Sequence, residues 1–229
     1  GNVRNKSTDE AERAVFAVPE FVLQMVEKRW IGQKAGQGFF KQVKSAQGKE
    51  ILALDINTLE YRPSVKPKYP SLDAAKTAKT LPEKLRALAY GKDKGSEFVW
   101  SVFKKVLLYS AEKAYEIADD IVAVDQAMKW GFGWELGPFE TWDAIGVEKS
   151  VAKMRAENEQ IPALVEELLA SGKTTFYQKA EGRREAFSIG GKYKAIEEDK
   201  KNINLAALKE QGKLIKKNAG AALIDLGDG

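Results

Sequence analysis

The 229-residue sequence contains neither cysteine nor histidine. Without cysteine, the chain forms no disulfide bond, holds no metal through thiolates and has no thiol nucleophile. Without histidine, it lacks the commonest general base, the catalytic pairs and triads that depend on histidine, and every histidine-ligated metal site. Two classes of function stay open: an enzyme that uses carboxylates or lysines, and a non-catalytic part of an enzyme.

Long apolar runs are also missing. No stretch of about 18 apolar residues occurs, so we expect no transmembrane helix and no membrane partner. The first residues carry Asp9, Glu10 and Glu12 and lack the apolar region of a signal peptide. The net charge of +4 is too small to identify a nucleic-acid binder. We therefore expect a cytoplasmic globular protein that binds no nucleic acid.

Both ends of the sequence look cut. It begins with glycine, and residues 223–229 (LIDLGDG) are typical of a strand that enters an Asp-Gly turn with no second strand after it. We therefore expect an excerpt of a longer protein. We also expect residues 221–226 to fray or to pair with another chain, because an unpaired strand edge is sticky.

Hydrophobic periodicity predicts a mainly helical fold. The clearest helix covers about 97–118. A second helix begins at a cap formed by Asp119 or Asp120, runs to Trp130 and ends at Gly131. Further helices are predicted at about 21–30, 71–79, 82–90, 138–145 and 147–158, several of them opened by proline or ended by glycine.

The remaining chain predicts hairpins and linkers. Strands are expected at about 39–43 and 50–54, with a turn at 46–48. Residues 61–71 carry three prolines with basic residues between them, which indicates an extended linker. The basic run Lys209, Lys213, Lys216 and Lys217 indicates a solvated helix face.

An internal repeat supports this segmentation. Residues 18–26 (VPEFVLQMV) match residues 161–169 (IPALVEELL), and residues 39–41 (FFK) match residues 176–178 (FYQ). The second copy is six residues shorter, around the loop at 31–36. Each copy leads into a hairpin-like segment. The chain is therefore expected to hold the end of one unit and most of another.

Three local patterns have competing interpretations. The glycines of 131–137 follow a helix and are spaced wrongly for a dinucleotide-binding fingerprint, so we interpret them as breaks between helices. Acidic residues gather between 119 and 143; paired carboxylates can perform acid–base chemistry, but helix capping already explains several of them. The tryptophans between 100 and 142 indicate a core with an apolar interface, or else a surface for an acyl chain.

Residues 118–131 (ADDIVAVDQAMKWG), followed by 136–140 (LGPFE), resemble the C-terminal helical domain of the 3-hydroxyacyl-CoA dehydrogenase family. Residues 30–41 (WIGQKAGQGFFK) resemble the segment that closes one such unit, and residues 218–229 resemble the entry to an enoyl-CoA hydratase-like module. Long bacterial β-oxidation proteins of this family carry two helical units in tandem after a Rossmann domain. The resemblance implies a mainly α fold of 6-phosphogluconate-dehydrogenase-C-terminal-like helical units with short β-hairpins and linkers.

The sequence also departs from the family. It contains no NAD-binding strand–glycine–helix unit and no catalytic His–Glu pair. Family members begin a helix of the first unit with Phe-x-x-Asn-Arg. The matching stretch in the second unit here, residues 98–102, has Ser101 at the Asn position and Val102 at the Arg position. We therefore assign no catalytic, cofactor-binding or metal-binding residue to this chain. The candidate packing or interface residues are Trp100, Ser101, Trp134, Pro138, Phe139 and Trp142.

The resemblance divides the chain into four parts. Residues 1–42 end a first helical unit, 43–96 form a hairpin and a Pro/Lys linker, 97–178 form a second helical unit, and 179–229 hold a hairpin, a linker and the start of a hydratase-like module. The implied parent oxidises 3-hydroxyacyl-CoA with NAD. This chain would pack on the parent's Rossmann domain, close the acyl-CoA cleft and join subunits as a homodimer, but would be inactive alone. The alternative is a stand-alone helical interaction module.

Overall fold

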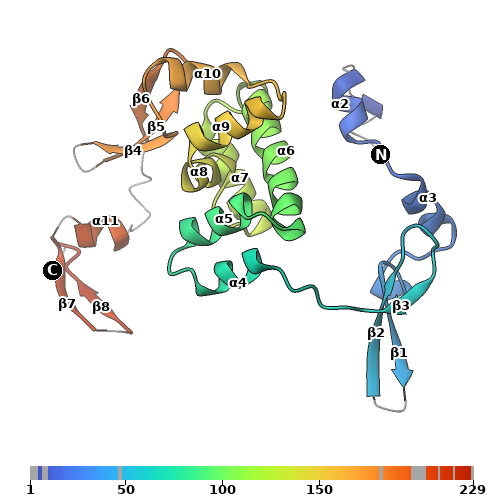
Figure 1. The fold of residues 1–229 in the computed structure, drawn as a ribbon. Coiled ribbons are helices and arrows are strands. Elements are labelled where there is room, and N and C mark those ends of the chain that lie inside the picture. The colour runs from blue at the N-terminus through green and yellow to red at the C-terminus, as the bar shows by residue number, and fades with distance from the viewer. Residues whose placement is uncertain are drawn as a thin grey trace. The chain divides into compact units, whose positions relative to one another are not determined.

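The structure, a computed structural model, describes residues 5–6, 10–45, 48–180, 183–196, 205–210, 212–218 and 220–227. These residues are mainly helical with small antiparallel sheets, which confirms the predicted fold class. Their contacts divide the chain into two compact units, Gly1–Pro67 (unit 1) and Lys68–Gly229 (unit 2), which are described one at a time (Figure 1).

Unit 1 combines short helices with a three-stranded sheet. Its elements are α2 (Glu10–Val15), α3 (Glu20–Glu27), the 3₁₀ turn η1 (Gln33–Ala35), β1 (Phe40–Ser45), β2 (Gly48–Leu54) and β3 (Tyr61–Pro63). The predicted hairpin is confirmed as the β1–β2 pair; Ala46 and Gln47 of its turn lie outside the described residues. The prediction of a linker from residue 61 is wrong at its start, because β3 pairs with β2.

Unit 2 carries the longer helices. Its elements are α4 (Pro70–Thr77), α5 (Leu81–Tyr90), α6 (Lys94–Ile117), α7 (Ile121–Phe132), α8 (Pro138–Ile145), α9 (Val147–Ala156), α10 (Ala163–Ala170), β4 (Tyr177–Ala180), β5 (Arg183–Ser188) and β6 (Lys192–Ala195). Strands β4, β5 and β6 form a second antiparallel sheet. The predicted helices of this region are confirmed.

Helix ends show where local chemistry sets the boundaries. Thr80 and Glu83 form a capping box at the start of α5, and Asp120 caps α7 through the Ala123 amide. The prediction that Gly131 ends α7 is wrong. The helix continues to Phe132 and ends at Gly133, which adopts the left-handed conformation (φ 68°) that glycine tolerates.

Helix α8 lies at the centre of unit 2. It contacts α5, α6, α7 and α9, and its residues Phe139, Trp142 and Ile145 are fully buried. The rings of Phe139 and Trp142 pack against Phe176, whose side chain comes from the segment just before β4. This aromatic layer joins the helices to the sheet, and large buried aromatic rings contribute strongly to such cores.

The C-terminal segment forms a hairpin with a short helix, α11 (Leu205–Glu210), before it. Strand β7 (Leu214–Lys217) pairs antiparallel with β8 (Ala222–Ile224). The prediction that the last strand lacks a partner is therefore wrong, because its partner precedes it. The basic run is not one helix face either: Lys209 lies in α11, whereas Lys216 and Lys217 lie in β7.

The internal repeat is also a structural repeat. Helices α3 and α10 each follow a proline with nearly the same backbone angles, φ −59° and ψ 145° at Pro19 and φ −57° and ψ 146° at Pro162. Each helix leads into a three-stranded antiparallel sheet. The third strand of each sheet supplies a tyrosine that closes the motif: Tyr61 donates to the Gly38 carbonyl at 2.7 Å and Tyr193 to the Thr175 carbonyl at 2.6 Å.

The six extra residues of the first copy fold back onto its sheet. The Gly32 amide donates to the Gln37 carbonyl at 3.0 Å, so the insertion closes on itself around η1. A Cβ atom on Gly38 would lie 2.8 Å from the Gly32 backbone. The second copy lacks the insertion and carries Thr175 at that position. The insertion therefore explains why only the first copy requires a glycine.

Candidate functional site

An apolar groove lies between α5, α6 and the segment that joins α7 to α8. We call it the α5–α6 groove. Its cavity volume is about 360 Å³, and nearly all its lining side chains are apolar. The lining residues are Leu81, Leu85, Val102, Phe103, Val106, Leu107, Trp134, Glu135, Leu136, Pro138 and Thr141. Clefts of this size and lining are typical of small-molecule sites.

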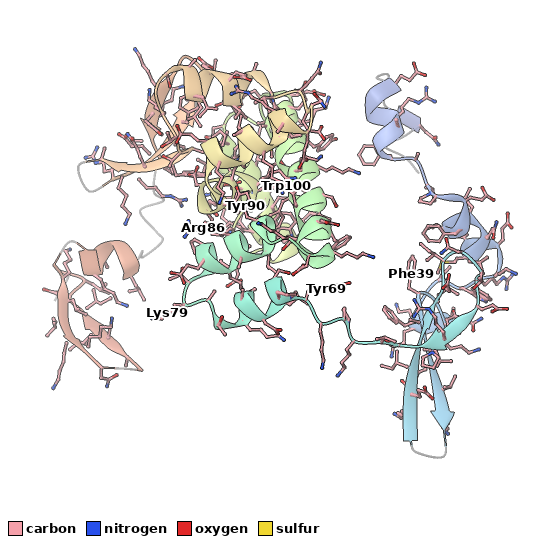
Figure 2. The ribbon with its side chains drawn as sticks, in the orientation of Figure 1. Phe39, Tyr69, Lys79, Arg86, Tyr90 and Trp100 are labelled. Atoms are coloured by element: carbon pink, nitrogen blue, oxygen red, sulfur yellow. The ribbon has the colours of Figure 1, made fainter. Side chains whose placement is uncertain are left out.

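Polar caps fix the walls of the groove. Asp93 accepts hydrogen bonds from the Ser96 amide at 3.0 Å, which begins α6, and from the Ser71 amide and hydroxyl at 2.8 Å, which secures α4. Arg86 and Tyr90 of α5 donate to the carbonyls of Ala144 and Ile145 at 3.1 Å, which fastens α5 to the end of α8. Figure 2 labels both α5 side chains. Hydrogen bonds between α5 and α8, and at the start of α6, therefore hold the helices that line the groove in place.

Trp100 belongs to the core rather than to the groove. Its indole N–H donates to Glu157 at 2.8 Å, and its ring lies 5.9 Å from the ring of Tyr90 (Figure 2). The Lys153 ammonium lies 4.3 Å from the indole centroid. Partial burial opposes ionisation of Glu157, yet hydrogen bonds from Lys104 and Trp100 hold its pKa below the usual value. Trp100 thus joins α6 to the end of α9.

The other predicted residues fall into two groups. Pro138, Phe139 and Trp142 are buried in α8, as a packing role requires. Trp134 remains 38% exposed at the mouth of the groove, and Ser101 is exposed with its hydroxyl donating to the Phe98 carbonyl at 2.8 Å. The structure brings Trp134 and Pro138 together in the groove lining, and it leaves Ser101 outside it.

A buried carboxylate links α7 to α8. Asp125 is 2% exposed and accepts hydrogen bonds from the amides of Phe139 (2.9 Å) and Glu140 (3.0 Å) and from the Tyr177 hydroxyl (2.8 Å). It therefore caps α8 from a neighbouring helix. Burial raises the pKa of Asp125 to about 6, although these hydrogen bonds oppose the rise.

A second carboxylate holds the sheet to the helices. Asp143 of α8 accepts hydrogen bonds from the amides of Phe176 (2.7 Å) and Tyr177 (2.9 Å), where β4 begins. Burial is the main cause that raises the pKa of Asp143 to about 7, and the neighbouring charge of Asp125 adds to the rise. Glu140 completes the contact with ion pairs to Lys129 at 3.0 Å and to Arg184 at 2.6 Å.

These carboxylates are structural. Asp120, Asp125, Glu140 and Asp143 each accept hydrogen bonds from backbone amides, and of these residues only Asp120 lines a described cavity. No group of acidic residues in the described ranges is arranged to hold a metal ion. The interpretation as caps therefore explains the acidic cluster. Sequence reasoning missed that Asp125 and Asp143 cap elements distant in sequence. It predicted the helix α5 but assigned it to the hairpin and linker part 43–96, so the contribution of α5 to the groove was missed.

The comparisons with known proteins give one extensive similarity. Over 227 residues, 99% of its length, the chain is 50% identical to the "Probable 3-hydroxyacyl-CoA dehydrogenase" of Bacillus subtilis (strain 168), of which it covers 28%. It is 27% identical over 58% of its length to the "Putative fatty acid oxidation complex trifunctional enzyme" of Rickettsia felis, covering 17% of that protein. A Rickettsia prowazekii protein of the same description is 28% identical over 51% of the chain.

These similarities confirm the expected resemblance to the 3-hydroxyacyl-CoA dehydrogenases. The chain spans less than a third of the length of each relative, so the relatives contain much additional sequence. No family model and no solved structure matches the chain. Among the described residues, no helix is both long enough and apolar enough to cross a membrane.

Proposed function

We propose that this chain is the helical region of an NAD-dependent 3-hydroxyacyl-CoA dehydrogenase of fatty-acid β-oxidation. In this role it supplies a substrate-cleft and dimerisation surface, while another part of the longer polypeptide binds NAD and carries the catalytic residues. The observation that supports this proposal most strongly is the 50% identity over 99% of the chain to a probable enzyme of that class. Identity spread over the whole chain includes both copies of the repeat.

The described residues do not fit a Rossmann-type NAD site. Such a site needs parallel strands joined by a helix, with glycines between the first strand and that helix. Every described strand pair is antiparallel, and the glycine segment 131–137 follows α7 instead of a strand. We therefore place NAD in a Rossmann domain of the same parent chain and assign no step of the hydride transfer to residues of this chain.

The α5–α6 groove is the part of the chain best suited to an acyl chain. Its lining is almost entirely apolar, and burial of apolar surface stabilises a bound hydrocarbon by about 0.8 kcal/mol for each methylene group. Val102 and Trp134 are exposed where they line the groove, so both can contact a ligand. In the proposed enzyme, this groove holds the acyl tail of the 3-hydroxyacyl-CoA substrate.

A groove-filling variant of the longer enzyme tests the proposal. Val102→Trp should reduce kcat/KM for a long-chain 3-hydroxyacyl-CoA by at least about tenfold, because one tenfold step corresponds to about 1.4 kcal/mol of lost transition-state binding. The four-carbon substrate should be affected much less. The matched control is Lys105→Trp, on the same helix and exposed, but not part of the groove lining. Equal losses for both chain lengths, or for both variants, would contradict the role of the groove.

The isolated 229-residue chain provides a second test. It should neither bind NAD in a calorimetric titration nor reduce NAD in the presence of a 3-hydroxyacyl-CoA. Micromolar NAD binding requires about 8 kcal/mol of binding free energy, which only a formed site supplies. Saturable binding at that level would refute the division of labour proposed here.

A stand-alone interaction module is the second candidate function. It is favoured by Trp130 and Phe132, large aromatic side chains of α7 that are 79% and 73% exposed. Exposed aromatic side chains of this kind are typical of contact surfaces. The intact mass of the native gene product decides between the two: a polypeptide near 25.4 kDa favours the module, whereas one several times larger favours the enzyme region.

A further inference from the structure

Unit 1 exposes an apolar surface that its repeat counterpart covers. Phe39, Phe40 and Ile51 line a cavity of about 490 Å³, and we call these three residues the Phe39 face. Figure 2 labels the Phe39 side chain. Phe39 is 51% exposed, whereas Phe176, at the same position of the repeat, is fully buried. The two residues occupy equivalent backbone positions, since the carbonyls of Phe39 and Phe176 accept hydrogen bonds from Leu54 (2.9 Å) and Phe187 (2.7 Å) of the adjacent strand.

The second copy shows what such a position packs against. The Phe176 ring lies 4.9 Å from the ring of Phe139 and 5.5 Å from that of Trp142, both on α8. Its amide donates to the Asp143 carboxylate at 2.7 Å. In the first copy, the Phe39 amide has no hydrogen-bond partner within the described part of the chain. Unpaired backbone amides are rare in folded proteins once they are removed from water.

The Phe39 face differs from its counterpart in polarity. Phe40 stands where Tyr177 donates its hydroxyl to Asp125, and by strand register Ile51 stands where Arg184 pairs with Glu140. Two polar contacts of the second copy are therefore replaced by apolar side chains in the first. The partner of the Phe39 face must be apolar at these two points, since a buried carboxylate without a donor is strongly destabilising.

This difference excludes α7 and α8 of a second copy of the chain as the partner. If α7 and α8 of another copy bound the Phe39 face, Phe40 and Ile51 would cover carboxylates that they cannot pair. The sheet of that other copy already occupies the surface as well, through Phe176 and Asp143. The relatives, in contrast, contain long stretches beyond the region that this chain matches.

We propose that the Phe39 face binds a helix of the longer polypeptide outside residues 1–229, related to α8. This helix places an aromatic pocket around the Phe39 ring, a carboxylate on the Phe39 amide, and apolar side chains against Phe40 and Ile51. The inference rests on the repeat and its contacts, and it is independent of the proposed dehydrogenase activity. A helical segment that lacks the carboxylate, or that belongs to another subunit, is not the partner described here.

Hydrogen exchange tests the first part of this inference. The Phe39 amide should exchange rapidly in the 229-residue chain and at least about a hundredfold more slowly in the full-length native polypeptide, because protection reports the free energy of local opening. The Phe176 amide serves as an internal control and should be protected in both samples. Equal exchange at Phe39 in both proteins, or a native polypeptide that consists of these 229 residues alone, would overturn the proposal.

Photo-crosslinking identifies the partner helix. A benzoylphenylalanine at position 39 of the full-length polypeptide should form an intramolecular cross-link, mapped by mass spectrometry to a helix that carries an aspartate. The same probe at Val65, which is 75% exposed in the linker, is the control for random collisions. A cross-link between two copies, or one to a segment without a carboxylate, would refute the proposal.

A charge at the face gives a third readout. Phe39→Asp should lower the melting temperature of the full-length polypeptide by several degrees more than it lowers that of the 229-residue chain. Failure of the full-length variant to fold, while the short variant folds, agrees with the same conclusion. Equal destabilisation of both proteins would show that Phe39 acts only within unit 1.

Discussion

Replacement of Phe176 by alanine should destabilise unit 2 far more than the same replacement at Phe39 destabilises unit 1. The two phenylalanines occupy the same position of the repeat, so the residue type and the hydrogen bond to the carbonyl are matched. They differ in burial, since the Phe176 side chain is fully buried between Phe139 and Trp142, whereas half of Phe39 is exposed. The comparison therefore isolates the contribution of the aromatic layer.

The magnitude follows from the buried ring. Phe→Ala substitutions in protein cores cost about 3–5 kcal/mol, because the lost transfer free energy is joined by the cost of a cavity. Phe176 should lie in the upper part of this range, since its neighbours are held by α8 and cannot collapse freely. Phe39→Ala should cost about 1 kcal/mol or less, because the half-exposed ring buries much less apolar area. Domains are stable by about 5–15 kcal/mol, so Phe176→Ala removes a large fraction of that stability.

The assay is urea denaturation monitored by hydrogen exchange. The exchange of individual peptides is needed because the two units can unfold separately, so that one transition does not describe both. Peptides from α8 and β4 report unit 2, and peptides from α3 and β2 report unit 1. The Phe39 ring contacts Phe21 edge-on, with the ring centroids 6.3 Å apart, but it lacks the two ring contacts that bury Phe176. If Phe39→Ala and Phe176→Ala destabilise their own units equally, the argument that Phe39 lacks this aromatic layer is refuted.

Three further predictions follow from the described contacts. Trp100→Ala should lower the free energy of unfolding by about 3 kcal/mol in thermal melts, because the variant loses a buried ring. Ser101→Ala should leave stability unchanged and keep kcat of the longer enzyme within a few-fold of the wild-type value. A hundredfold loss of kcat in Ser101→Ala would contradict this prediction. Because the folded-state pKa of Asp143 is raised to about 7, its stabilising contribution is full below its ordinary pKa of 3.8 and is lost as the pH rises towards 7. In urea titrations, Asp143→Asn should therefore flatten the decline of the free energy of unfolding between pH 3.8 and pH 7. The exposed control Asp119→Asn should leave this decline unchanged. Gly38→Ala should destabilise unit 1 by about 1–3 kcal/mol in hydrogen exchange, because the new Cβ would meet the backbone of the insertion at 2.8 Å; an unchanged exchange pattern would show that the insertion moves aside.

Local chemistry in the sequence predicted most of the helices. The capping residues of α5 and α7, and the prolines before α3 and α10, are visible as residue types at the expected spacing. Gly131 misled the prediction because a glycine can also remain inside a helix, and the left-handed backbone that ends α7 comes two residues later. Periodicity alone does not distinguish two nearby glycines.

Contacts between distant residues could not be predicted in the same way. Strand β3 has only three residues, and it is defined by its pairing with β2 rather than by any pattern of its own. Asp125 and Asp143 have the residue type of local helix caps, yet each caps an element 14 to 33 residues away in the sequence. Predicting the groove requires both the helix boundaries and the contacts between distant residues, because the position of α5 depends on its hydrogen bonds to the end of α8.

The junction between α7 and α8 explains why the segment that carries the family resemblance is so distinctive. Asp125 reaches the first amides of α8 only because Gly137 has no side chain: a Cβ there would lie 2.4 Å from Asp125. Pro138 begins the helix at a position where its missing N–H costs nothing. The Glu140 carboxylate accepts a hydrogen bond from the Gly137 amide at 3.0 Å. The Leu-Gly-Pro-Phe-Glu stretch is thus required by a buried cap. A search for the catalytic residues of the proposed enzyme must therefore begin outside this stretch.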